Sequence, residues 1–127
     1  MHRSRLAALV LDSHVEDIDS SAEFWGRALG CPVRPADPGD AKYRELDVPN
    51  TEVRALLQQV DHPSRVHLDI ETDDIAAEVA RLEKLGAKVI DRLPRWTVME
   101  APTGHRFCVV QPQRPDFESS PDVNVWD

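Results

Sequence analysis

Apolar and polar residues alternate along the segment from residue 65 to residue 71. The apolar members of the pattern are Val66, Leu68 and Ile70, and the polar members are Arg65, His67, Asp69 and Glu71. A period of two directs the two sets to opposite faces of a β-strand. The sequence therefore predicts a strand whose apolar face packs under a helix, with His67 on the opposite, polar face.

A helical pattern follows this strand. Its apolar stripe consists of Ile75, Val79, Leu82 and Leu85. Asp73 or Asp74 can cap the amino end of the helix, and Gly86 stands where a left-handed carboxyl cap belongs. The segments "AKVIDRL", "RWTVMEA" and "HRFCVVQ" then predict strands, and "PTG" predicts a turn between the last two. The predicted order is strand, helix, strand, strand, strand.

The first half of the chain repeats this order. The segment "LVLDSHVEDI" at residues 9–18 matches "VHLDIETDDI" at residues 66–75 in a Leu, two Asp and an Ile. The next predicted helix carries the apolar stripe Ile18, Ala22, Trp25 and Leu29. Ser20 with Glu23 has the pattern of a capping box, and Gly30 ends the helix as Gly86 ends the other. An internal repeat of this kind predicts two modules of the same build.

Three further strands complete the first module in "CPVRP", "YRELDVP" and "VRALLQQV", with turns predicted at "ADPGD" and "PN". Each module exposes one sheet face, and two modules side by side can curl their sheets into an open cup with the helices outside. We therefore predict an α+β fold of two paired βαβββ modules that form a curved mixed sheet. The chain is expected to be a single domain 1–127, with module one at about 5–61, module two at about 64–112 and an irregular tail at 113–127.

Two segments, "RVHLDIETDDIAAEVARLEKLGAKV" and "RWTVMEAPTGHRFCVV", resemble the vicinal oxygen chelate superfamily in its glyoxalase-like and bleomycin-resistance-like branch. The first module resembles it more loosely, through "LVLD" and "AEFWGRALG". The resemblance extends over residues 6–111. It implies paired βαβββ modules, a cup that holds a ligand, often a divalent metal ion, and frequently a homodimer.

The resemblance also implies where metal ligands would stand, one on each of four strands. In this sequence those positions hold Ala8 or Val10, Gln58 or Gln59, His67, and Cys108. Only His67 matches the ligand of the metal-using members. Hard divalent ions prefer carboxylates, thiolates favour softer metals, and a catalytic zinc site usually has three protein ligands. We therefore expect no metal and no other cofactor.

Two functions remain open at this point. The first is a protein that binds a small organic ligand in its cup, and the enzyme alternative is a lyase, isomerase or dioxygenase. The residues expected to line the cup are Ala8, Val10, Gln58, His67, Asp69, Trp96 and Cys108. In the enzyme, His67 is a metal ligand or a general base, and Asp69 orients it. Three plainer interpretations stand beside these: His67 satisfied by hydrogen bonds in a polar cavity, Trp96 in ordinary packing, and Cys108 as a small buried side chain.

The composition excludes some classes of binding partner. The 127 residues include 15 basic and 23 acidic side chains, a net charge of -8, so the surface repels nucleic acid. No apolar run approaches the roughly 20 residues that span a bilayer, and no secretory leader is evident, so we expect a cytoplasmic protein. The tail carries Phe117 and Trp126, which one small domain has difficulty covering alone. Together with the resemblance, this favours a homodimer.

Overall fold

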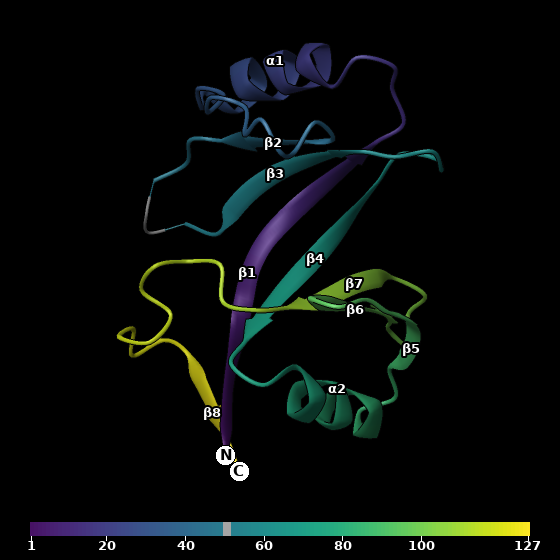
Figure 1. Cartoon of the computed structure of the whole chain (residues 1–127), viewed down its shortest axis with the longest axis vertical. Helices are drawn as coiled ribbons and strands as arrows, with labels where there is room; N and C mark the ends of the chain where they lie inside the picture. Colours follow the sequence, from purple (N-terminus) through teal and green to yellow (C-terminus); the bar gives the residue numbers. More distant parts are fainter. Residues whose placement is uncertain (50–51) are drawn as a thin grey trace. The chain divides into compact units, whose positions relative to one another are not determined.

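The computed structural model describes residues 1–49 and 52–127. These residues form two compact units, a first unit of residues 8–67 and a second unit of residues 1–7 together with 68–127. The elements, drawn in Figure 1, are β1 (His2–Ser13), α1 (Ile18–Leu29), β2 (Tyr43–Leu46), β3 (Arg54–Gln59), β4 (Arg65–Thr72), α2 (Ile75–Lys84), β5 (Lys88–Arg92), β6 (Trp96–Glu100), β7 (Arg106–Val110) and β8 (Asn124–Trp126). The predicted α+β class, with a helix and strands following a first strand in each half, is confirmed.

In the first unit, the second half of β1 pairs in parallel with β3, and β3 pairs antiparallel with β2. Helix α1 packs on one face of these strands, as Figure 1 shows for β2 and β3. The core between them consists of Ile18, Ala22, Leu46 and Leu57, with Trp25 packed against it. Trp25 therefore belongs to the helix stripe, as predicted.

The prediction of a strand in "CPVRP" is wrong. Of these residues only Val33 makes an isolated antiparallel bridge, with Leu46. Pro32 and Pro35 have no backbone N–H to donate to a neighbouring strand, so a continuous ladder cannot form. The "ADPGD" turn is present, and the N–H of Asp40 donates to the carbonyl of Asp37 at 2.9 Å. The expected turn at "PN" includes Asn50, which lies outside the described residues.

The amino end of α1 also differs from the prediction. Asp17 is the cap, and its carboxylate accepts a hydrogen bond from the N–H of Asp19 at 3.0 Å. Ser20 lies inside the helix and donates its hydroxyl to Asp17, so the capping box of Ser20 and Glu23 is wrong. An aspartate directly before a helix caps its first turn as well as a serine does. At the other end Gly30 adopts the predicted left-handed conformation, with φ of 70°.

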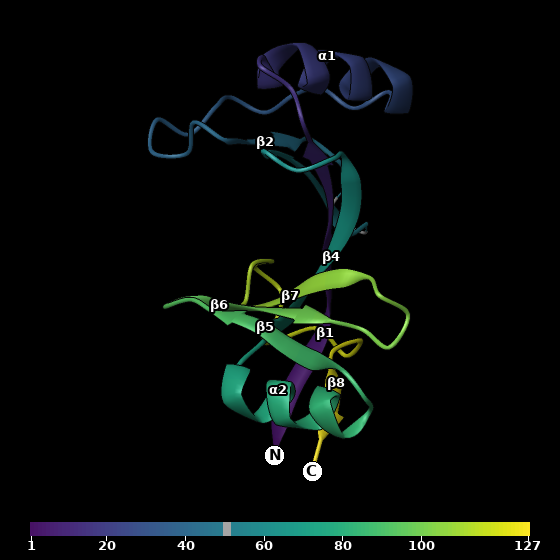
Figure 2. The same cartoon turned by 90° about the vertical axis from the view of Figure 1, so that its right-hand side faces the viewer.

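In the second unit, β4 pairs in parallel with β7, followed by antiparallel β6 and β5. Asp74 caps α2, and the helix buries Val79 and Leu82 against Met99 and Val109. Figure 2 shows α2 lying along one side of these strands. Leu85, which the stripe placed in the core, caps the helix and is 66% exposed, because the helix ends there at the left-handed Gly86.

The apolar face of β4 is buried only near its carboxyl end. Ile70 packs against the core, whereas Val66 and Leu68 remain 51% and 42% exposed. Helix α2 has 10 residues and packs on β5, β6 and β7. A helix of that length reaches roughly 15 Å, so it leaves the first half of β4 uncovered. The prediction that Val66 and Leu68 belong to the core is therefore wrong.

The tail, expected to be irregular, ends in the short strand β8. Figure 2 shows β8 beside the start of β1, with which it pairs antiparallel. Phe117 is 2% exposed, beneath the guanidinium groups of Arg3 and Arg5. The ring of Trp126 lies 3.9 Å from the guanidinium carbon of Arg81. The second unit itself thus buries Phe117, whereas Trp126 is only partly buried.

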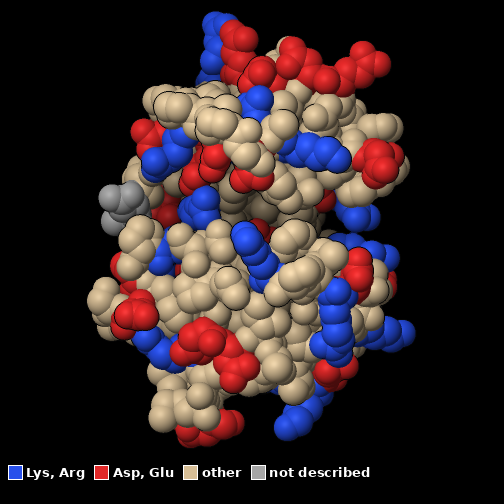
Figure 3. Space-filling model, viewed as in Figure 1, with Lys and Arg blue, Asp and Glu red and all other residues tan. Residues whose placement is uncertain are grey.

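Two features of the surface bear on partners. Acidic and basic side chains are interspersed over the face shown in Figure 3. Helices α1 and α2 have 12 and 10 residues. Since a membrane-spanning helix needs about 20, no helix in the described part of the chain could cross a membrane.

Candidate functional site

One face of the sheet in the first unit is turned away from α1. Leu11 and Leu57 are paired across β1 and β3 and pack toward the helix. Alternate residues point the other way. The residues on this opposite face are Ala8, Val10, Asp12, Arg54, Leu56 and Gln58. The structure therefore places the predicted Ala8, Val10 and Gln58 together on one face, while Gln59 belongs to the helix side.

Asp12 and His67 form a short polar contact on this face. Nδ1 of His67 lies 2.8 Å from Oδ2 of Asp12, and the two side chains are 12% and 4% exposed. Because a carboxylate only accepts, Nδ1 of His67 is the donor in this contact. A carboxylate orients histidines in this way both in metal sites and in general-base catalysis.

Two further basic side chains approach the same carboxylate. Nε of Arg65 lies 3.8 Å from Oδ2 of Asp12, and Nε2 of His62 lies 4.0 Å from it. The second oxygen, Oδ1, is buried and has no hydrogen-bond partner among the described residues. Asp12 is thus a buried carboxylate with one short contact, two longer ion pairs and one unsatisfied oxygen.

The loops that carry these residues are tied together. The N–H of Val60 donates to the carbonyl of Ser13 at 3.0 Å. The N–H of His14 donates to the hydroxyl of Ser64 at 2.9 Å. These two bonds hold the loop after β1 beside the loop before β4. The basic cluster around Asp12 is therefore supported by main-chain contacts and does not depend on side chains alone.

The remaining predicted site residues lie in the second unit. Asp69 and Cys108 are directly paired across β4 and β7, and Trp96 lies on β6. All three point away from α2, because the alternate residues Ile70 and Val109 pack in the core beneath that helix. Trp96 is 36% exposed, so its ring is available for packing on a ligand.

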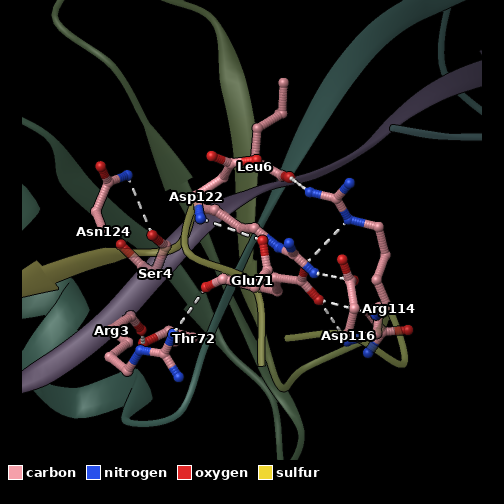
Figure 4. A network of polar contacts seen from close by, with 12 residues as sticks. Arg3, Ser4, Leu6, Glu71, Thr72, Arg114, Asp116, Asp122 and Asn124 are labelled. Atoms are coloured by element: carbon pink, nitrogen blue, oxygen red, sulfur yellow. Dashed lines mark hydrogen bonds and ion pairs between the residues drawn. The ribbon is translucent and has the colours of Figure 1, made fainter. Parts of the chain in front are cut away.

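Glu71 occupies the end of the same face and is completely buried. Its Oε1 accepts the N–H groups of Gln113 and Arg114 at 2.6 and 3.0 Å. Its Oε2 accepts a hydrogen bond from Nε of Arg5 at 2.7 Å and from Nε of Arg114 at 3.2 Å. Figure 4 shows Arg114 beside Glu71. Burial raises the pKa of Glu71, but these hydrogen bonds outweigh burial and hold the pKa below its usual value. Glu71 is therefore an anchor for the tail.

Sequence reasoning named Asp69 as the carboxylate that orients His67, and it did not assign that role to Asp12, whose Oδ2 lies 2.8 Å from Nδ1 of His67. The repeat contained a signal that could have found it. In the matched segments "LVLD" and "VHLD", Asp12 stands where Asp69 stands in the second module. The tail contacts of Glu71 had no such signal, because alternation alone does not tell a lining carboxylate from a buried one.

The positions assigned by resemblance to metal ligands do not supply a full set of donors. Ala8 and Val10 are buried hydrocarbon side chains on β1. Gln58 offers a neutral amide and Cys108 a thiol, where a hard divalent ion prefers carboxylates. This donor set therefore does not fit the metal of the metal-using superfamily members.

Comparisons with known proteins agree with this fold. A family model described as a glyoxalase-like domain matches residues 8–110. The uncharacterized protein YwbC of Bacillus subtilis (strain 168) is 29% identical, over 76% of this chain and 82% of that protein. A hypothetical protein from Bacillus halodurans C-125 has a similar structure, with a TM-score of 0.61, 12% identity and coverage of 87% of this chain and 95% of that one. A glyoxalase/bleomycin resistance protein/dioxygenase superfamily member from Vibrio splendidus 12B01 gives a TM-score of 0.50, 18% identity and coverage of 85% and 97%.

Proposed function

The chain belongs to the glyoxalase-like domain family, and on this basis we propose that it binds a small organic ligand through the sheet face that carries His67. The observation that carries the proposal is the 2.8 Å contact between His67 and Asp12. It fixes the orientation of an imidazole on a face that also offers small and apolar side chains. Sites for small molecules combine such an apolar lining with a few precisely placed polar groups.

The proposed binding does not use a metal ion. Ala8 and Val10 stand where a ligand of the metal-using members would be, and neither side chain can coordinate a cation. The family itself does not decide between binding and catalysis, because one scaffold carries many chemistries.

A thermal-shift screen of metabolites and antibiotics tests this proposal. A ligand at about 100 times its dissociation constant stabilises the folded protein by roughly 2.7 kcal/mol. Each hit is then titrated against His67→Asn, in which the amide nitrogen can still donate to Asp12 while the Nε2 position is lost. We expect this variant to bind about tenfold more weakly, and Arg27→Gln on the outer side of α1 to bind normally. A library without hits, or a hit indifferent to His67→Asn, contradicts the proposal.

The second candidate function is an enzyme with a soft metal, and the pairing of Asp69 with Cys108 favours it. A carboxylate and a thiolate are both zinc ligands. Elemental analysis of protein purified without chelator separates the two candidates. Near-stoichiometric zinc that disappears in Cys108→Ser would replace the metal-free proposal.

We also propose that the protein is a homodimer. One of the two motives for this is weaker, because Phe117 is buried within the chain and Trp126 packs against Arg81. The family resemblance remains. Sedimentation equilibrium at micromolar concentration is the test, and a clean 14.3 kDa monomer would overturn the proposal.

A further inference from the structure

The first unit contains a hydrogen-bond acceptor that lacks a donor. Oδ1 of Asp12 is buried without a partner among the described residues, although the side chain is only 4% exposed. Buried carboxylate oxygens are almost always hydrogen-bonded, because an unsatisfied one loses its hydration without compensation. The geometry therefore points to a donor that arrives from outside the chain.

Beside it stands a set of donors that lacks an acceptor. Nε of Arg65 is 3.8 Å from Oδ2 of Asp12, which is too long for a hydrogen bond. The guanidinium makes no hydrogen bond to any residue of 1–49 or 52–127, and its side chain is 47% exposed. Arg65 can therefore turn its five N–H donors toward a ligand without breaking a hydrogen bond.

The charges of this pair decide what kind of group fits. Asp12 and Arg65 carry opposite unit charges and nearly cancel, so neither a bare cation nor a bare anion is favoured strongly. One unsatisfied acceptor next to unsatisfied donors complements a neutral group that offers both one N–H and one carbonyl oxygen. Carboxamides and lactams have this pattern in a single plane.

We propose that Asp12 and Arg65 bind a carboxamide or lactam group, whose N–H donates to Oδ1 of Asp12 and whose carbonyl oxygen accepts from Arg65. His67 holds Asp12 in place from the other oxygen, and Nε2 of His62 lies 4.0 Å from that same oxygen, Oδ2. The inference rests on the proposed function, since it names the chemical class of the ligand at that site. It concerns Asp12, His62, Arg65 and His67, which all belong to the first unit.

Three aromatic probes of one size test it: benzamide, benzoate and benzylammonium. Each is titrated into the full chain at neutral pH, with backbone amide shifts followed by NMR. We expect benzamide to bind with the lowest dissociation constant and to shift the amides of residues 12–14, 60–62 and 64–67. Tighter binding of benzoate would mean that Arg65 acts as an anion site, and tighter binding of benzylammonium that Asp12 acts as a cation site. Either result overturns the proposal.

Two variants then assign the contacts. Arg65→Gln and Asp12→Asn are each expected to raise the dissociation constant of benzamide about tenfold, whereas Arg27→Gln leaves it unchanged. Arg65 is half exposed, so Arg65→Gln remains informative if Asp12→Asn folds poorly. If benzamide does not bind, or if it binds Arg65→Gln as tightly as the natural chain, the inference is wrong. The proposed function survives that result if another ligand still depends on His67, and fails separately if no organic ligand binds at all.

Discussion

At the scale of single residues, the chemistry of this chain is set by how buried carboxylates are neutralised. Asp12, Glu71 and Glu78 are all at least 95% buried. Both oxygens of Glu71 and both oxygens of Glu78 accept hydrogen bonds, whereas only one oxygen of Asp12 has partners. The carboxylates that are fully satisfied hold the structure together, and the one that is not stands on the face proposed for the ligand.

The contact of Asp12 with His67 predicts a measurable coupling. A hydrogen bond to a charged group contributes roughly 1.5–3 kcal/mol to the stability of the folded protein. We expect Asp12→Asn and His67→Ala to be non-additive by about 1 kcal/mol or more in a double-mutant cycle of urea unfolding. The pair Asp61→Asn with His67→Ala is the control, since Asp61 is exposed. Additive losses for Asp12 and His67 would mean that their contact contributes nothing to folding.

Glu78 predicts how stability depends on pH. Burial raises its pKa, but hydrogen bonds from Arg81, His2 and Ser4 outweigh burial and lower the pKa to about 2. Because the folded pKa lies below the value of 4.5 expected for a free glutamate, the stabilisation is complete above that pH. It is lost as the pH falls toward 2.

The difference between the folded and unfolded pKa values of Glu78 corresponds to about 3 kcal/mol of stability. Urea unfolding measured from pH 6 to pH 2.5 should therefore show a steeper loss for the natural chain than for Glu78→Gln. Glu83→Gln, an exposed neighbour on α2, should keep the full slope. Equal slopes for the natural chain and Glu78→Gln would show that this carboxyl is not perturbed.

At the scale of elements, local patterns located the helices well and their ends less well. The stripes of α1 and α2 are right in the middle, since Ala22, Val79 and Leu82 are buried. They fail at the last position, where Leu29 and Leu85 are 54% and 66% exposed. The period of the apolar residues extends each stripe to the leucine just before the terminal glycine, but little of that leucine packs against the rest of the protein. The extent of a partner surface is not contained in the local sequence.

Gly26 shows a packing constraint that helix propensity does not reveal. It lies inside α1, where alanine would ordinarily be favoured by up to about 1 kcal/mol. A Cβ atom at this position would stand 2.8 Å from the carbonyl oxygen of Cys31 and 3.3 Å from Val33.

We therefore expect Gly26→Ala to destabilise the protein by about 1–3 kcal/mol, measured by chemical denaturation. Ala28→Gly, at an exposed position of the same helix, should cost about 1 kcal/mol from propensity alone. A stabilised Gly26→Ala variant would mean that the chain from Cys31 to Val33 moves away easily.

At the scale of the whole chain, the repeat allowed the α+β class and the order of elements to be predicted. It did not predict that residues 1–7 group with the second half of the chain, or that the tail adds a strand to β1. Those contacts join segments far apart in the sequence, from 66 residues for Arg5 and Glu71 to 122 for Ser4 and Trp126, and no local period records them. The same limit applied to the site. Alternation predicted the face of the strand on which Asp69 lies, but the contact of His67 with Asp12 depends on how distant strands are aligned, which alternation does not give.

Glu71 is the test of how the tail and the second unit depend on each other. Arg5 and Arg114 meet on its carboxylate, and their side chains are only 7% and 16% exposed. Arg5 also donates to Asp116 at 2.6 Å, which links the network to the tail a second time. Removing the central charge leaves two largely buried guanidinium groups without their shared partner. Breaking one side of such a buried pair costs about 3 kcal/mol or more.

We expect Glu71→Gln to lose about that much stability in urea unfolding and to expose residues 113–127 to limited proteolysis. Glu118→Gln, at an exposed position of the tail, should change neither result. A chain that ends at Gln111 should be destabilised as well, and adding Glu71→Gln to it should cost less than in the full chain, because the contacts from Gln113 and Arg114 are already gone. If Glu71→Gln costs the same in both backgrounds, the carboxylate acts through Arg5 alone, and the tail does not need it.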